Sequence, residues 1–63
     1  MRLTYRWSEA SKEWLLFKNG VCCGWVREDR SVEQPFIFKV YGHHPGVAGS
    51  LTQALKFAAV FVR

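Results

Sequence analysis

The sequence has no long hydrophobic run and no set of spaced cysteines. Its longest apolar stretch, from Phe57 to Val62, is far shorter than the ~20 residues that a membrane-spanning helix needs. Cys22 and Cys23 are adjacent, whereas small secreted domains are held by spaced pairs. The opening residues are followed by no apolar segment, so no secretory signal is predicted. We therefore expect a soluble protein of the cytoplasm.

The sequence also lacks a run of charges of one sign. Nine basic and five acidic residues give a net charge of +4, and the basic residues are spread along the whole chain. A basic balance favours an acidic partner, which is either a nucleic acid or an acidic protein surface. The missing basic run argues against a nucleic-acid-binding tail.

Aromatic residues are the abundant class. The 63 residues include five Phe, three Trp and two Tyr, and each buried aromatic side chain removes roughly 150–250 Å² from water. A chain of this length buries only ~60% of the surface that its unfolded form exposes, so bulky side chains help to build its small core. We expect residues 1–63 to form a single folded domain.

A β-hairpin is the strongest local signal. Asn19-Gly20 lies between two apolar runs, and this dipeptide favours a two-residue turn in which both residues have positive φ. Such a turn places Lys18 opposite Val21 and, counting outward, Trp14 opposite Trp25. These four residues are then predicted to share one face of the hairpin.

Two more strands and a helix complete the predicted fold. Residues 2–7 and 36–41 alternate between apolar and polar residues, as half-buried strands do. Ser50 and Gln53 form a capping box before a helical apolar pattern. The glycine-rich segment 42–49 is predicted to be a loop. The sequence thus predicts an α+β fold, a three- to four-stranded antiparallel meander packed by one C-terminal helix, with a core of Leu3, Tyr5, Trp7, Leu15, Phe17, Cys22, Val26, Phe36, Phe38 and Val40.

Candidate chemistry is sparse. The two cysteines and the pair His43-His44 invite a zinc hypothesis, but adjacent strand residues point to opposite faces, and zinc sites use spaced cysteines. A Cys–His nucleophile pair lacks an orienting carboxylate. The loop before the helix lacks the lysine and the glycine spacing of phosphate-binding loops. We expect no enzyme activity, no metal and no cofactor.

The face of the sheet opposite the predicted core combines cations with aromatic residues. Such a combination suits base stacking with phosphate neutralisation, and it also suits a protein interface, where Trp, Tyr and Arg are enriched. Two plainer interpretations remain open: the two tryptophans form a cross-strand pair that only stabilises the hairpin, or the middle strands turn this face toward the helix. The predicted partner-binding residues are Arg2, Arg6, Trp14, Lys18, Trp25, Arg27, Lys39 and Tyr41.

A second candidate surface lies on the helix. Phe57 falls at the margin of the apolar face, and Val60 falls nearly opposite that face, beside Lys56. An exposed apolar strip of this kind often marks self-association or partner binding. Lys56, Phe57 and Val60 are therefore predicted to form a homodimer or partner patch.

The chain resembles many small proteins encoded by bacteriophages. The resemblance is carried by Trp14, the turn Asn19-Gly20, the run from Gly24 to Val26 and a late Leu-x-x-Ala-Leu helix. It implies a non-enzymatic accessory protein that binds and inhibits a host enzyme or defence complex in the host cytoplasm. The order of strands followed by a helix is also similar to that of phage integrase arm-binding domains, which read DNA with the sheet.

The function predicted from the sequence is a small binding protein that inhibits or modulates a host protein complex. The alternative is a nucleic-acid-binding domain that uses the same basic and aromatic face. Net charge favours the alternative, whereas the dispersed cations and the acidic residues Glu28, Asp29 and Glu33 favour a protein partner.

Overall fold

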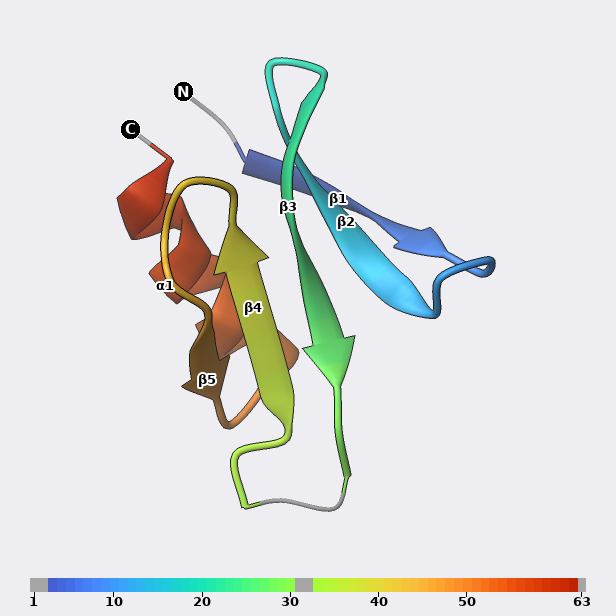
Figure 1. The fold of residues 1–63 in the computed structure, drawn as a ribbon, viewed down its shortest axis with the longest axis vertical. Helices are drawn as coiled ribbons and strands as arrows, with labels where there is room; N and C mark the ends of the chain where they lie inside the picture. Colours follow the sequence, from blue (N-terminus) through green and yellow to red (C-terminus); the bar gives the residue numbers. More distant parts are fainter. Residues whose placement is uncertain (1–2, 31–32, 63) are drawn as a thin grey trace.

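Five antiparallel strands and one helix make up the described part of the chain, residues 3–30 and 33–62 of a computed structural model (Figure 1). The strands neighbour one another in sequence order. The α+β class, the antiparallel meander and the C-terminal helix are as predicted, but the sheet has five strands rather than three to four. The elements are β1 (Leu3–Ser8), β2 (Glu13–Lys18), β3 (Val21–Glu28), β4 (Phe36–Val40), β5 (Gly46–Ala48) and α1 (Leu51–Phe61).

The β2–β3 hairpin has the predicted turn. Asn19 and Gly20 have φ values of 53° and 80°, which is the conformation that a tight hairpin turn requires. Lys18 pairs with Val21 as predicted, but a β-bulge then shifts the register by one residue, at Cys23. Beyond the bulge, Trp25 pairs with Leu15 instead of Trp14. The predicted pairing of the two tryptophans is therefore wrong.

Gly24 explains why the hairpin departs from a regular ladder at this point. A Cβ atom on Gly24 would lie 2.0 Å from the carbonyl oxygen of Lys39, so β4 approaches the β3 backbone more closely than any side chain allows. One extra residue in a strand moves every later side chain to the other face. Val26 therefore enters the core beside Leu16, and Trp25 lies on the opposite face.

β5 lies within the segment that was predicted to be a loop. Gly46 pairs with Phe38 of β4, and a Cβ atom on Gly46 would lie 2.5 Å from the Phe38 ring. The missing side chain thus lets the ring lie against the glycine backbone. Two residues later, Ala48 is fully buried. The glycine that indicated a loop is here a packing residue in an edge strand.

The helix begins at the predicted cap. The Ser50 hydroxyl accepts a hydrogen bond from the Gln53 amide at 3.1 Å, and the Gln53 side chain accepts one from the Gly49 amide at 3.0 Å. Ala54 and Ala58 face the sheet and are fully buried, because their small side chains let the helix lie close to it. The buried core consists of Leu16, Val26, Phe38, Val40, Ala48, Ala54, Ala58 and Val62.

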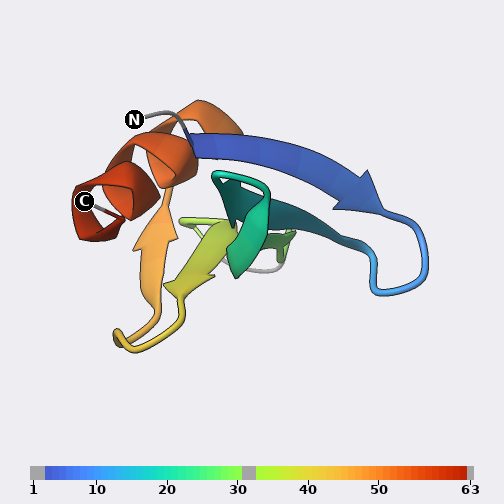
Figure 2. The same ribbon diagram turned by 90° about the horizontal axis from the view of Figure 1, so that it is seen from above.

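The helix covers only part of the sheet. It packs on β3, β4 and β5, and the far end of the β1–β2 hairpin projects away from it (Figure 2). Tyr5 and Trp7, which were predicted to be core residues, are therefore 53% and 44% exposed. Three other predicted core residues lie on the face opposite the helix, namely Leu15, Phe17 and Cys22. Val26, Phe38 and Val40 are buried as predicted, and Leu3 and Phe36 are partly buried against them.

The described residues also bear on membrane insertion. Within residues 3–30 and 33–62, no helix is long and apolar enough to cross a membrane.

Candidate protein-binding face

The side of the sheet that carries no helix forms one continuous surface, here called the open face. Its residues alternate along each strand with those of the core, and their positions follow from the strand registers. All five strands contribute to it. The open face consists of Thr4, Arg6, Glu13, Leu15, Phe17, Cys22, Trp25, Arg27, Ile37, Lys39, Tyr41 and Val47.

One row of paired residues crosses the middle of the open face. Arg6 pairs with Leu15, Leu15 pairs with Trp25, and Trp25 pairs with Lys39. The two central residues are half-buried apolar side chains, and a cation stands at each end of the row. The Lys39 ammonium donates to the carbonyl oxygen of His43, which holds that end of the row against the β4–β5 turn.

Arg27 is fixed beside this row. Its Nε donates to the Oε1 of Glu13 at 2.7 Å, and its guanidinium lies 4.4 Å from the centroid of the Trp25 ring. The Glu13 side chain is only 9% exposed, so the ion pair satisfies a carboxylate that is nearly buried. Arg27 thus holds the Trp25 ring in place while part of its own guanidinium remains at the surface.

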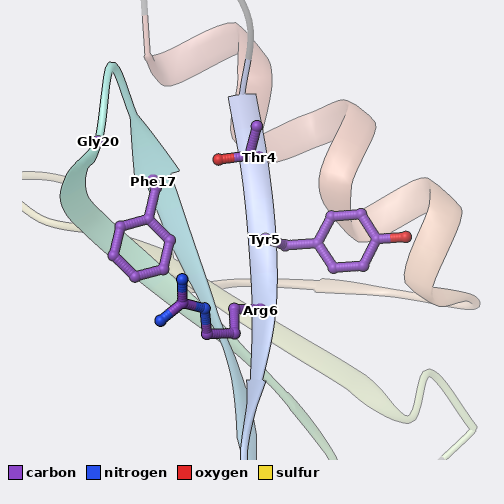
Figure 3. Close-up of a pocket in the computed structure, with 5 residues that line it drawn as sticks. All are labelled: Thr4, Tyr5, Arg6, Phe17 and Gly20. Atoms are coloured by element: carbon purple, nitrogen blue, oxygen red, sulfur yellow. The ribbon is translucent and has the colours of Figure 1, made fainter.

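A pocket lies at the other end of the row. It has a volume of about 340 Å³ and is lined by Thr4, Tyr5, Arg6, Phe17 and Gly20. The Arg6 guanidinium lies 5.8 Å from the centroid of the Phe17 ring. Figure 3 shows the Thr4 oxygen and the Arg6 guanidinium on the Phe17 side of β1, whereas the Tyr5 ring points away on the other side.

Two groups near the bulge have a raised pKa. Burial, and then the neighbouring Cys22, raise the pKa of the Cys23 thiol, which disfavours the thiolate that nucleophilic or metal-binding cysteines need. A hydrogen bond with Cys22, and then burial, raise the pKa of the Tyr41 hydroxyl. Within the described ranges, no group of three or more His, Cys, Asp or Glu residues is placed to hold a metal ion.

The structure brings together five of the eight residues predicted to bind a partner. Arg6, Trp25, Arg27, Lys39 and Tyr41 share the open face. Trp14 and Lys18 do not, because they point to the same side of β2 as Leu16, which is the helix side of the sheet. Arg2 lies outside the described residues. The sequence interpretation placed Leu15 and Phe17 in the core. The bulge at Cys23 was the missed signal, because it moves Val26 to the face of the sheet opposite Leu15 and Phe17.

The predicted helix patch is exposed only in part. Val60 is 54% exposed and Phe57 is 40% exposed, and Lys56 lies on the surface beside them. The Phe57 ring is tilted against the Phe38 ring with centroids 6.1 Å apart, so Phe57 also covers the core. The adjacent Phe61 ring lies 4.8 Å from the His43 ring. The patch therefore adjoins the β4–β5 turn.

Comparison with known proteins finds no matching family model, no similar curated protein and no similar solved structure.

Proposed function

We propose that the protein is a non-enzymatic binding protein whose open face docks on an acidic patch of a larger protein and thereby inhibits or modulates it. The observation that carries the proposal is the row Arg6–Leu15–Trp25–Lys39, with its apolar centre and its cationic ends. Protein interfaces combine a desolvated apolar centre with a polar rim in the same way.

The row also defines the partner's surface. Three strand spacings separate β1 from β4, so the backbones of Arg6 and Lys39 are roughly 14 Å apart. A complementary surface would present an apolar group between two carboxylates at about that separation. Such charge pairs at the rim set the orientation and raise the rate of association, while Trp25 and Leu15 supply the apolar contact.

A protein partner fits the open face better than a nucleic acid does. Arg27 is already paired with Glu13, which reduces the charge available for phosphate groups. Leu15, Ile37 and Val47 are aliphatic, and no base stacks on an aliphatic side chain as it does on an aromatic ring. Because the chain resembles phage accessory proteins, the proposed partner is a host protein complex in the host cytoplasm.

The test is capture from bacterial lysate by the tagged protein, with and without nuclease, followed by mass spectrometry. The proposal expects one stoichiometric protein that withstands nuclease and that the double variant Arg6→Glu/Lys39→Glu no longer captures. The double variant Lys12→Glu/Arg30→Glu is the matched control, because it reverses two exposed charges outside the open face and should leave capture unchanged. Equal capture by the double variant would contradict docking through the open face.

Nucleic-acid binding remains the second candidate because of one observation. Two arginines lie over aromatic rings on the same face, Arg6 over Phe17 and Arg27 over Trp25, and arginine and aromatic side chains together bind single strands. A fluorescent single-stranded oligonucleotide distinguishes the two candidates. Binding that weakens steeply with salt would favour the nucleic acid, because each neutralised phosphate releases counterions.

A further inference from the structure

The open face contains two arginine–aromatic pairs, and one of them also includes an acidic side chain. Arg27 lies over Trp25 and is also bonded to the nearly buried carboxylate of Glu13. Arg6 lies over Phe17 in a similar way. Among the residues that the structure describes, no carboxylate pairs with Arg6. The Arg6 pair thus has the guanidinium and the ring but lacks the acid.

The space beside Arg6 is the 340 Å³ pocket lined by Thr4, Tyr5, Arg6, Phe17 and Gly20. A guanidinium is a donor with no acceptor, and the Thr4 hydroxyl can donate as well. Among the residues that the structure describes, no acidic side chain lines the pocket. The side-chain chemistry of this pocket is therefore that of an acceptor-binding site with one positive charge and an aromatic wall.

A partner that covers this pocket must supply acceptors. If an apolar group covered Arg6, its guanidinium donors would lose water without gaining a hydrogen bond, which is costly for a charged group. A carboxylate matches the planar guanidinium with two parallel hydrogen bonds. A phosphate dianion would be only half neutralised by Arg6, which is the one cation among the described residues of the lining.

We propose that this pocket binds the carboxylate of an aspartate or glutamate side chain from the partner protein. That carboxylate completes a set of acid, guanidinium and aromatic ring at Arg6, as Glu13 completes the same set at Arg27. The inference rests on the proposed function, since it names the group that one end of the row recognises. It assigns Arg6 to bidentate binding of the carboxylate, Thr4 to a supporting hydrogen bond, and Phe17 to holding the guanidinium in place.

The experiment titrates the ¹⁵N-labelled protein with acetyl-glutamate amide at constant ionic strength and follows its amide and arginine Nε signals by NMR. Saturable shifts are expected at Thr4, Arg6 and Gly20. Acetyl-glutamine amide, which has the same shape without the charge, should give no saturable shift. Inorganic phosphate is the third ligand, and it should bind more weakly than acetyl-glutamate amide.

Three variants sharpen the result. Arg6→Gln should raise the dissociation constant about tenfold or more, because a charge-assisted hydrogen bond is lost. Arg6→Lys, which keeps the charge but not the planar fork, should recover only part of the affinity. Arg30→Gln removes an exposed cation that lies outside both the pocket and the open face, and it should leave the dissociation constant unchanged. The same spectra show whether each variant is folded.

Several outcomes would overturn the inference: equal binding of the glutamine analogue, tighter binding of phosphate, or an unchanged dissociation constant in Arg6→Gln. The proposed function fails separately. If acetyl-glutamate amide saturates the pocket while lysate capture yields no protein, the site is real and the docking function is wrong. If capture depends on Lys39 but the pocket binds no carboxylate, only the inference is wrong.

Discussion

The β1–β2 hairpin and the rest of the molecule are built differently. Seven of the eight buried core residues lie in β3, β4, β5 or at α1 and its C-cap, whereas β2 contributes only Leu16 and β1 contributes none. The hairpin instead supplies Arg6, Leu15 and Phe17 to the open face. The packed part thus gives the domain its stability, and the hairpin carries much of its proposed binding surface.

Aromatic contacts join the two parts. The Trp7 and Trp14 rings meet edge to face with centroids 4.7 Å apart, and the Trp14 ring lies 6.1 Å from that of Phe36 in β4. These contacts lie on the helix side of the sheet, beyond the area that the helix covers. Trp14, which was predicted to bind a partner, therefore anchors the hairpin to the packed part.

The largest effect is expected inside the packed part, at the contact between β3 and β4. Gly24→Ala would place a Cβ atom 2.0 Å from the Lys39 carbonyl oxygen, and this obstacle is backbone rather than a flexible side chain. Overpacking of this kind costs about 3 kcal/mol or more, and a domain of this size has only ~3–5 kcal/mol of stability. The variant should be largely unfolded by circular dichroism at 25 °C.

Gly49→Ala is the matched control for that variant. Its Cβ atom would meet only the Gln53 side-chain oxygen, at 3.4 Å, so it should fold normally. A folded Gly24→Ala protein would show that β3 and β4 can separate without loss of the core, and the stability of the packed part would then not depend on their close approach.

A smaller effect tests the division itself. Phe38→Leu shrinks a residue that is 5% exposed, and Trp7→Leu shrinks one that is 44% exposed. We expect the first to lower the free energy of unfolding by about 1–2 kcal/mol and the second by about 0.5–1 kcal/mol. Urea denaturation measures both. Equal losses would mean that the hairpin contributes to stability as much as the packed part does.

A pH effect is expected at the β1–β2 turn. Hydrogen bonds from Lys12 and then from the Trp7 indole, the latter at 2.6 Å, lower the pKa of Glu9. Because the pKa of Glu9 is lower in the folded state, the ionised Glu9 side chain stabilises the fold. This stabilisation is present above the ordinary glutamate pKa and is lost as the pH falls through the folded-state pKa of Glu9. The Trp7 indole NMR signal should shift in that acidic range. The signal should show no such step in Glu9→Gln, and a step that persists there would assign it to another group.

The smallest effect on stability is expected on the helix surface. Val60 is exposed, so Val60→Glu should change the free energy of unfolding by less than about 0.5 kcal/mol. A homodimer through Lys56, Phe57 and Val60 is a separate prediction. If it is right, the wild-type chain associates as its concentration rises and the variant does not. Sedimentation at several concentrations decides this, and a wild-type chain that remains monomeric contradicts the dimer.

Local chemistry was enough to predict some elements. The Asn19-Gly20 turn and the Ser50 cap depend on residues within a few positions of each other, and both form as expected. The bulge depends on the distant Lys39 carbonyl, and β5 depends on the Phe38 ring that lies against Gly46. A sequence pattern does not reveal such contacts, which is why the pairing of Trp14 with Trp25 was wrong and why the loop predicted at 42–49 missed the strand at Gly46–Ala48.

The open face was predicted only in part for the same reason. Arg6 and Lys39 lie in strands whose alternation is regular, so their shared face followed from the period of two. Leu15 and Phe17 are as apolar as core residues, and the side of the sheet on which α1 packs decides which face of β2 is buried. That side is set by tertiary packing, which the sequence pattern does not state.

The sequential strand order has a consequence for folding. Each strand pairs with the one that precedes it, so the sheet can grow hairpin by hairpin with little loss of chain entropy, as in topologies that fold quickly. The helix follows all five strands in the sequence, and its buried residues pack with Val26, Phe38 and Val40 in one core cluster. During synthesis, the strands therefore leave the ribosome with their apolar side bare. A chain that stops before Leu51 would be an aggregation-prone sheet, which makes translation of the final turns of α1 the step that protects the protein.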